Sequence, residues 1–316
     1  MAKHNQVILN GQVSSQPKLV YDDDGKTIKR VMFGVEVLHG NRDFGNEIDK
    51  VKYDVPLVFA TDPTIIQKVK DFQKGDIVEI KGTITTKDVV KRTVCKFCGH
   101  QHSKLGNVVC ITPIFAEVRE KGLSDEKGKK VIRDRCEISN LVTVIAPLCR
   151  EPMLYMTEKG TPITTYQLAI RRKYYIKDSA KPDVRTDFPW VKSYGAIAQN
   201  DAKSLKKGSY VFIDGLIQVR QLRRFQECEE CGKTYEWTDS ATEIVPYAVE
   251  YLRDYYSVDE IQAREKQESL AAIQQVFNED EISLNRPTET PDFNDFNDPE
   301  TQKDETSNNT ANDVLN

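Results

Sequence analysis

Residues 74–82 are Lys74-Gly-Asp-Ile-Val-Glu-Ile-Lys-Gly82, and the pattern returns at residues 207–215 as Lys207-Gly-Ser-Tyr-Val-Phe-Ile-Asp-Gly215. A Cys-x-x-Cys-Gly motif at residues 95–99 returns in the same way at residues 228–232. Both repeats have an offset of 133 residues (207 minus 74, and 228 minus 95). Chance does not produce this register, so the 316-residue chain contains two copies of one unit.

The offset is larger near the start of each copy. Pro17 corresponds to Pro152, an offset of 135 residues (152 minus 17). The second copy therefore lacks two residues that the first copy has. We predict that they are lost between residues 60 and 74 of the first copy, which correspond to residues 195–207 of the second.

The residue pattern within each copy predicts a five-stranded barrel. Alternation places Gly82 and Gly215 among the inward-facing residues of their strands, where a glycine allows the close backbone approach of a tightly curved sheet. Five strands with a short helix between the third and the fourth are typical of the OB-fold, which binds oligonucleotides or oligosaccharides. The predicted fold is all-β, with two tandem OB-fold barrels, a C-terminal helix and a disordered acidic tail.

The domain boundaries follow from changes in composition. Ser257 and Glu260 form a capping box that predicts the start of a helix, and the proline-containing polar sequence after it predicts disorder. The predicted organisation is a first OB-fold domain with a metal knuckle over 1–120, a linker over 121–136, a second OB-fold domain over 137–253, a helix over 254–278 and a disordered acidic tail over 279–316.

The net charge of −4 is unevenly distributed. Residues 279–316 contain eleven acidic and two basic residues, so this tail carries −9 and the rest of the chain +5. A basic body with an acidic tail suits a polyanion-binding protein whose tail competes for the groove or recruits partners, although a tail that only increases solubility is the simpler alternative. The sequence predicts no membrane span or signal peptide, and we expect a cytoplasmic protein.

Both copies resemble the bacterial single-stranded-DNA-binding proteins. The first copy has the opening turn of that family at residues 17–26 and its third strand at 53–60, and the second copy has the matching motifs at 152–162 and 188–195. The resemblance implies sequence-independent binding and protection of single-stranded DNA during replication, recombination, repair or conjugative transfer. Two barrels per chain and the cysteine motifs depart from the usual family pattern, and they suggest a member from a mobile element or phage.

A site that binds single strands of any sequence needs cations for the phosphates and flat side chains on which bases stack. The candidate aromatic residues are Phe33, Tyr53, Phe59, Tyr166, Tyr174, Tyr175, Phe188, Trp190 and Tyr194. The candidate cations are Lys87, Lys91, Arg92, Arg171, Arg172, Arg220, Arg223 and Arg224. The family resemblance implies a stacking aromatic residue at Tyr53 and Phe188. Aromatic residues in strands are often core residues, and this alternative stays open for Phe33 and Phe59.

The cysteine motifs predict structural zinc rather than disulfides or redox chemistry. In the first copy, Cys95 and Cys98 can complete a tetrahedral site with Cys110 and either His100 or His102. In the second copy, Cys228 and Cys231 have only Glu243 or water to add. Three interpretations stay open: one zinc per copy, one site shared by the four motif cysteines, or a zinc in the first copy alone. The first copy is favoured as a zinc site.

The sequence predicts no enzymatic activity, because it contains no Walker loop, nucleophile elbow or open metal site. We expect single-stranded DNA as the partner, with RNA as an alternative because a stacking surface accepts both sugars. A homodimer would supply four barrels, the number that the resemblance implies. A second hypothesis is an OB-fold adaptor that recruits replication or transfer proteins through its helix and acidic tail.

Overall fold

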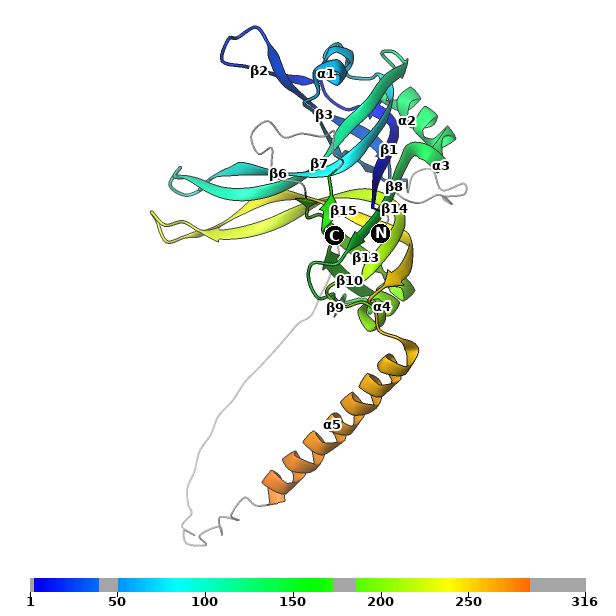
Figure 1. Ribbon diagram of the computed structural model, residues 1–316. Helices are drawn as coiled ribbons and strands as arrows, with labels where there is room; N and C mark the ends of the chain where they lie inside the picture. The colour runs from blue at the N-terminus through cyan, green and yellow to red at the C-terminus, as the bar shows by residue number, and fades with distance from the viewer. Residues whose placement is uncertain (1–2, 40–50, 173–185, 285–316) are drawn as a thin grey trace, which may run out of the picture. The chain divides into compact units, whose positions relative to one another are not determined.

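The described part of the chain is built mainly from strands (Figure 1). The computed structural model describes residues 3–39, 51–172 and 186–284. The first copy contains β1 (His4–Val13), β2 (Lys18–Tyr21), β3 (Ile28–Leu38), β4 (Tyr53–Asp54), β5 (Leu57–Ala60), α1 (Pro63–Val69), β6 (Ile77–Val94) and β7 (Gln101–Glu120). The second copy contains β8 (Asn140–Pro147), β9 (Met153–Met156), β10 (Pro162–Gln167), β11 (Ile170–Arg171), β12 (Thr186–Asp187), β13 (Trp190–Tyr194), α4 (Gly195–Ser204), β14 (Tyr210–Glu227) and β15 (Thr234–Arg253).

The first copy closes into a barrel. β1 pairs with β3 and β6, β3 pairs with β5, and β6 pairs with β7, all in antiparallel fashion. A parallel pairing of β5 with β7, in which Val58 lies opposite Ile111, completes the ring. α1 lies between the third and fourth strands of this ring in the sequence. The arrangement therefore confirms the predicted OB-fold order.

The second copy forms the same kind of ring. β8 pairs with β14, β14 with β15, and β10 with β13, again antiparallel, while β13 pairs with β15 in parallel with Val191 opposite Ile244. A bridge between Leu148 and Leu168 joins the end of the first strand to the second. α4 occupies the place that α1 has in the first copy.

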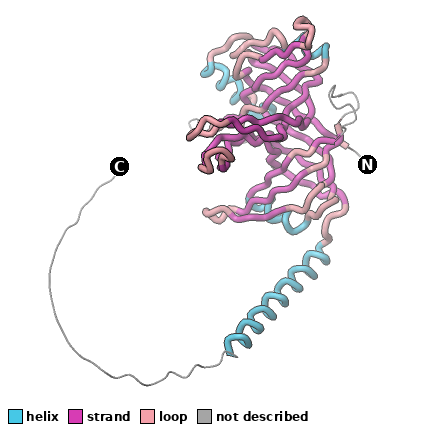
Figure 2. Tube along the Cα trace, turned by 90° about the vertical axis from the view of Figure 1, so that its left-hand side faces the viewer, coloured by secondary structure: helices cyan, strands magenta, loops and turns pink. Residues whose placement is uncertain are grey.

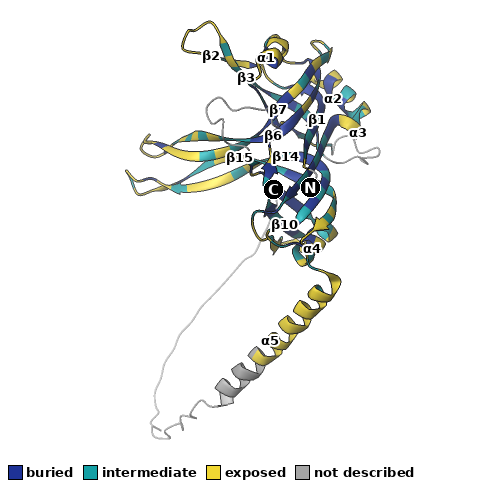
Figure 3. Ribbon diagram, in the orientation of Figure 1, coloured by how far each residue is buried: buried dark blue, intermediate teal, exposed yellow. Residues whose placement is uncertain are grey.

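Alternation of inward-facing and outward-facing residues gives each barrel its core (Figure 3). Val7 and Leu9 in β1 and their counterparts in β8 point inward, and they belong to one continuous apolar cluster. A Cβ atom on Gly82 would lie 2.7 Å from the carbonyl oxygen of Thr112, and one on Gly215 would lie 2.3 Å from that of Val245. The expected close backbone approach at both glycines is therefore confirmed.

The two barrels are joined by direct strand pairing. β1 and β8 pair antiparallel along six residues, from His4 opposite Ile145 to Leu9 opposite Asn140. Through this pairing the strands of both copies form one continuous 13-stranded sheet, and β11 and β12 form a separate two-stranded sheet. Residues 1–262 accordingly form a single compact unit. The strand edges that each barrel presents at β1 and β8 therefore cover one another.

The two residues that the second copy lacks lie earlier than predicted. In the first copy Leu19 pairs with Val31, and in the second copy Leu154 pairs with Thr164. The offset between copies is 135 at the first member of each pair and 133 at the second, so it changes at the turn between β2 and β3. The first copy carries a β-bulge there, where the register shifts beyond Val20. Surface turns and bulges absorb extra residues more readily than a barrel strand does.

The segment between the copies is helical, in contrast to the predicted polar linker. α2 (Asp125–Asp134) begins after Ser124, whose hydroxyl accepts a hydrogen bond from the backbone of Lys127. A short α3 (Cys136–Ser139) follows it directly. Ile132 is fully buried, whereas most of the charged residues of α2 face outward, so high charge conceals a one-sided helix.

The C-terminal helix α5 (Val258–Leu284) begins where the sequence predicts and extends past the predicted end at residue 278. The capping box is confirmed: the Ser257 N–H donates to Glu260 Oε2 (2.7 Å), and the Glu260 N–H donates to Ser257 Oγ (3.3 Å). Residues from Ala263 onward form a separate unit. Residues 285–316, most of the predicted tail, lie outside the described residues. No helix within the described ranges has the length and apolar character of a membrane span.

Candidate nucleic-acid interface and metal centre

Two long hairpins extend from the barrels and lie side by side in both views (Figures 1 and 2). We call the outer part of the β6–β7 hairpin, residues 86–109, the first arm, and the outer part of the β14–β15 hairpin, residues 219–242, the second arm. The arms contact each other directly. Thr93 Oγ1 lies 2.8 Å from the hydroxyl of Tyr235, and Lys91 Nζ lies 2.5 Å from Asp239 Oδ1.

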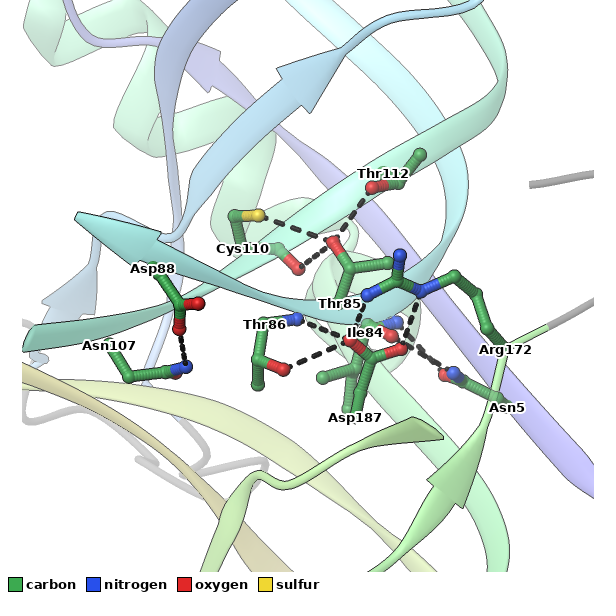
Figure 4. A network of polar contacts seen from close by, with 10 residues as sticks. All are labelled: Asn5, Ile84, Thr85, Thr86, Asp88, Asn107, Cys110, Thr112, Arg172 and Asp187. Carbon is green, nitrogen blue, oxygen red and sulfur yellow. Dashed lines mark hydrogen bonds and ion pairs between the residues drawn. The ribbon is translucent and has the colours of Figure 1, made fainter. Parts of the chain in front are cut away.

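Each arm is anchored at its base by a buried aspartate of the opposite barrel. Asp187 of the second barrel accepts hydrogen bonds from the Thr86 N–H (2.7 Å) and hydroxyl (3.0 Å) at the base of the first arm (Figure 4). Asp54 of the first barrel accepts one from the Val219 N–H (2.7 Å) at the base of the second arm. These exchanged contacts fix the direction in which both arms leave the barrels.

The Asp187 carboxylate is held by an arginine that is itself buried. Arg172 donates from Nε (2.9 Å) and Nη2 (2.6 Å) to the two oxygens of Asp187 (Figure 4). The side chain of Arg172 is 2% exposed and that of Asp187 is 0% exposed. A charge pair this deep is stable only because each member satisfies the other. The prediction that Arg172 binds DNA is therefore wrong: its guanidinium serves the arm anchor.

The four motif cysteines meet at the tips of the arms. Their sulfur atoms, from Cys95, Cys98, Cys228 and Cys231, all lie within 4.8 Å of one another. Cys95 Sγ is 3.8 Å from Cys231 Sγ, and Cys98 Sγ is 3.6 Å from Cys228 Sγ. Each arm contributes one Cys-x-x-Cys turn, which a backbone hydrogen bond from Gly99 or Gly232 to the first cysteine closes. Gly99 and Gly232 have φ values of 75° and 65°, which favour glycine.

This geometry matches the shared-site interpretation among the three that the sequence left open. Cys110, predicted as a ligand in the first copy, lies elsewhere: it is buried opposite Thr85 in the β6–β7 ladder, 3.2 Å from the Thr85 hydroxyl (Figure 4). Glu243 forms a two-pronged ion pair with Arg220 (2.8 Å to each oxygen). A site completed within the first copy was the favoured expectation, and it is wrong. The two further thiols that lie beside Cys95 and Cys98 come from the other arm.

His102 lies beside the four-cysteine centre. Its Nε2 is 3.3 Å from Cys228 Sγ, and its ring stacks on Tyr235 at 5.7 Å between centroids. His100 contacts the edge of the His102 ring at 4.7 Å and is exposed. His102 therefore contacts a cysteine of the opposite arm and supports the centre from one side.

The chemistry of the centre favours a cation. Burial has the largest single effect on the Cys95 thiol and raises its pKa, but hydrogen bonds from the backbone of Phe97 and Cys98 and from the Cys98 and Cys228 side chains together lower it to about 6. The pKa of Cys98 is raised despite a backbone hydrogen bond at His100, because burial and the neighbouring sulfurs oppose its ionisation. Four thiolates this close repel one another unless a positive ion lies between them. The donor set fits a thiophilic metal ion.

A groove of about 630 Å³ lies where the second barrel meets both arms. The barrel contributes aromatic and basic side chains, and the guanidinium of Arg150 lies 5.8 Å from the centre of the Trp190 ring. The lining residues are Cys149, Arg150, Gln167, Phe188 and Trp190 from the barrel, and Lys91, Asn107, Val108, Val109, Leu222, Arg224, Asp239, Ser240, Ala241, Thr242 and Glu243 from the arms and their bases.

The two aromatic side chains of this groove, Phe188 and Trp190, share a strand face with Tyr194, which lies outside the groove. Phe188 is 46% exposed, and Trp190 and Tyr194 are half-buried, whereas the alternate residues between them point into the barrel. Lys192 extends this face, because its ammonium lies 5.7 Å from the ring centres of both Tyr155 and Tyr194. The face therefore presents flat side chains, with the buried Lys192 ammonium packed between two of the rings.

The first barrel has a smaller version of this face. Phe59 is half-buried between two cations, with Lys87 Nζ 5.3 Å and the Arg30 guanidinium 5.9 Å from its ring centre. Tyr53 accepts a hydrogen bond from Arg133 (3.2 Å). With the corrected offset, Trp190 corresponds to Leu57 in the first copy. The aromatic residues on the outer strand faces of the two barrels therefore do not occupy matching positions.

Two aromatic predictions were wrong. Phe33 is 2% exposed and meets Phe72 edge-on at 5.7 Å, and Tyr166 is fully buried. They are equivalent residues of β3 and β10, and alternation directs both into the barrel cores. The core alternative was correct for Phe33, whereas Phe59 lies on the outer face.

The predicted cations occupy several environments. Arg92, Arg223 and Arg224 are exposed on the arms, and Arg171 is exposed at the end of β11. Lys91, Arg220 and Arg223 face the carboxylates Asp239, Glu243 and Glu236, respectively. Only Lys91 and Arg224 of the predicted cations line the groove. Tyr174 and Tyr175 lie outside the described residues.

Sequence reasoning missed Arg150, Asp239 and Trp237. Arg150 follows the first strand of the second copy and is not part of a cluster of basic residues. Asp239 and Trp237 lie in β15, beyond the cysteine motif. One available signal was the cross-strand register of the arm, which places Trp237 opposite Arg224.

Comparisons with known proteins point to one family. The model of the "Single-strand binding protein family" matches residues 139–243, which is the second copy. A single-stranded DNA-binding protein of Caldanaerobacter subterraneus is 35% identical over 81 residues, covering 26% of this chain and 52%, about half, of that relative. One of Staphylococcus aureus (strain MRSA252) is 27% identical over 160 residues, covering 51% of this chain and 92% of the relative.

Among solved structures, the wild-type single-stranded DNA binding protein of Thermus aquaticus aligns over 81% of this chain and 97% of its own, with 15% identity and a TM-score of 0.48. The family match falls on the barrel whose strand face lines the groove. The match of the second copy to this family agrees with the expectation that the chain is not an enzyme. The second copy of the chain therefore matches the single-strand binding protein family.

Proposed function

We propose that this chain binds single-stranded DNA, independently of sequence and without catalysing a reaction on it, in the groove between the second barrel and the arms. The observation that carries the proposal is the strand face of Phe188 and Trp190 beside Arg150, with Arg224 on the facing arm. Bases can stack on such rings whatever their identity, while the guanidinium groups neutralise phosphates.

Single strands suit this groove better than a duplex does. The aromatic faces lie inside a groove that is walled by the arms, and only unpaired bases can turn their flat faces toward them. The groove also contains Asp239 and Glu243, so its charge is mixed and cannot by itself hold a duplex through phosphates alone. Stacking therefore supplies a large share of the affinity.

For the four-cysteine centre we propose a structural Zn²⁺. Tetrahedral coordination with Zn–S bonds of about 2.3 Å separates the sulfur ligands by about 3.8 Å. The two sulfur–sulfur distances of 3.8 and 3.6 Å across the arms agree with that value. Four thiolates leave no open coordination position, so the ion would hold the two arms together rather than act on a substrate.

For the wider role of the protein we propose only the general roles of single-strand binding proteins. We propose protection of single-stranded DNA during replication, recombination, repair or conjugative transfer, in the reducing cytoplasm where the seven free cysteines are stable. The homodimer and the recruitment of replication or transfer proteins through the acidic tail remain predictions. RNA is an alternative ligand that the same rings would accept.

The test is a binding titration of labelled oligo-dT, oligo-rU and duplex of equal length at low and moderate salt. We expect oligo-dT to bind much more tightly than duplex, with affinity that falls as salt rises. Arg150→Ala should weaken this binding and reduce the salt dependence by about one phosphate contact. Arg119→Ala, which removes a cation paired with Glu79 and Glu117 on the first barrel, is the matched control. Equal affinity for duplex, or no binding, would overturn the proposal and favour the adaptor.

A further inference from the structure

A second groove follows the seam between the two arms. It has a volume of about 950 Å³, and both arms line it from their middle to the cysteine turns. Lys104 and Leu105 come from the first arm, and Arg224, Phe225 and Trp237 come from the second. Arg224 and Trp237 lie opposite each other in the β14–β15 ladder, so that a cation and an aromatic ring are direct neighbours.

The seam groove is continuous with the groove of the second barrel. Lys91, Arg224 and Asp239 line both. A strand that leaves the Trp190 face therefore meets the same cations at the entrance of the seam. No other surface needs to be crossed on the way to the arm tips.

The arms expose large apolar side chains along this path. Leu105 is 75% exposed, and Phe225 is 72% exposed. Leu105 and Phe225 do not join the small buried cluster of Cys95, Cys228 and Tyr235 at the arm tips. Exposed apolar side chains gathered on one surface mark a binding site. The alternation of Phe225 and Trp237 with Arg224 and Lys104 suits bases and phosphates better than it suits an apolar protein partner.

The length of this path follows from the positions of the two tryptophans of the chain. Trp190 lies opposite Glu243 of β15, and Trp237 precedes Glu243 by six residues in the same strand. At about 3.3 Å per strand residue, the two positions are about 20 Å apart along β15. A single strand with bases at the stacked spacing of about 3.4 Å would cover this distance with about six nucleotides.

We propose that the seam between the arms is a second binding segment for single-stranded DNA, which continues the path from Trp190 of the barrel to Trp237 and Phe225 of the arms. This inference rests on the proposed function. The four-cysteine centre gives the segment its shape, because it holds together the two arms that form its walls. The footprint of the second barrel is therefore longer than its barrel face alone.

The experiment uses the full chain and its two tryptophans as separate reporters. Trp237→Phe leaves Trp190 as the single tryptophan, and Trp190→Phe leaves Trp237. Each variant is titrated with oligo-dT of about 20 nucleotides, longer than the usual site of one OB-fold. We expect this oligonucleotide to quench both reporters at the same saturation point. Quenching of Trp190 with unchanged emission from Trp237 would overturn the inference and leave the proposed function intact, whereas absence of binding would overturn both.

A second variant tests the segment by affinity. Phe225→Ala should weaken binding of the long oligonucleotide about five-fold or more, and it should leave a pentanucleotide bound to the barrel face almost unaffected. Tyr21→Ala, which removes an exposed aromatic ring that lines neither groove, is the matched control. An equal effect of Phe225→Ala on both lengths, or none on either, would contradict the inference.

Discussion

Val7 of β1 lies opposite Val142 of β8, and these two residues are equivalent positions of the two copies (142 minus 7 is 135). A residue faces its own counterpart only where a two-fold axis passes between them. The cysteine centre has the same symmetry: Cys228 and Cys231 are the counterparts of Cys95 and Cys98, so a two-fold rotation exchanges the Cys95–Cys231 contact with the Cys98–Cys228 contact. The two copies are therefore related by a pseudo-two-fold axis, as two subunits of a symmetric dimer would be, within a single chain.

The axis explains why the two arms share one four-cysteine centre. Each copy alone carries two thiols, and the rotation that pairs β1 with β8 brings the two arm tips together. The exchanged anchors, Asp54 on the second arm and Asp187 on the first, follow from the same rotation. The first prediction is therefore one bound zinc per chain instead of two.

Metal analysis of the purified protein under reducing conditions checks this stoichiometry. Cys98→Ser and Cys231→Ser, one in each arm, should each remove the zinc, because each leaves only three thiolates for the same ion. Cys110→Ser should retain it, since Cys110 lies in the barrel beside Thr85. Two zinc ions per chain, or retention of the metal by Cys231→Ser, would show that the arms bind separately.

The second prediction concerns the buried anchor of the first arm. Asp187→Asn removes the carboxylate charge that faces the buried Arg172 guanidinium and weakens two hydrogen bonds to Thr86. We expect the free energy of unfolding to fall by about 3–5 kcal/mol, measured by urea denaturation. Asp22→Asn, which breaks the exposed Lys29 pair, should change it by less than about 1 kcal/mol. Equal small effects would mean that the Arg172–Asp187 pair contributes little to folding.

The third prediction separates ring contacts with DNA from core packing. Phe188→Ala should weaken oligo-dT binding by about 1–3 kcal/mol while stability changes little, because the ring is 46% exposed in the groove. Phe33→Ala should lower the free energy of unfolding by about 3–5 kcal/mol and leave the affinity of the folded protein nearly unchanged. Thermal unfolding and titration of the same two variants provide both readouts. A loss of affinity in folded Phe33→Ala would contradict this assignment.

The repeat in the sequence was sufficient to predict both barrels, because strand alternation and the paired glycines at 82 and 215 report the barrel directly. The site was less accessible to this reasoning. A cysteine motif shows its own two ligands, but the partners of Cys95 and Cys98 lie more than 100 residues away and meet them only through the pairing of β1 with β8. Arg172 was predicted to be a surface cation because it lies in a run of basic residues. That run does not reveal that the buried carboxylate of Asp187 pairs with Arg172 in the fold.

The fourth prediction is a pH dependence of stability that arises at Asp201. Burial raises the pKa of Asp201 to about 6, above its usual 3.8, although the Tyr251 hydroxyl donates a hydrogen bond to it (2.9 Å). The native state thus keeps this proton at pH values where the unfolded chain has lost it. The contribution of Asp201 to stability should therefore be greatest below about pH 4, decrease as the pH rises to about 6, and stay low above that.

Comparison with Asp201→Asn isolates this contribution from the other carboxylates. The variant should gain stability relative to the native chain as the pH rises from 4 to 6, by no more than about 3 kcal/mol. Urea midpoints at pH 4, 5, 6 and 7 provide the measurement. A constant difference between the two proteins over this range would show that Asp201 ionises normally in the folded state.

The fifth prediction concerns the point where the two grooves join. Asp239 holds Lys91 across the arms at 2.5 Å, and both side chains line both grooves. A phosphate at this point must compete with the Asp239 carboxylate for the Lys91 ammonium. Asp239→Asn should therefore strengthen oligo-dT binding several-fold and steepen the dependence of log affinity on log salt by about 0.7, the contribution of one additional phosphate contact on a single strand. Glu117→Gln removes the same charge beside Arg119, outside both grooves, and should leave that slope unchanged. An unchanged slope in Asp239→Asn would place the phosphates away from Lys91 and move the path of the strand off the junction of the two grooves.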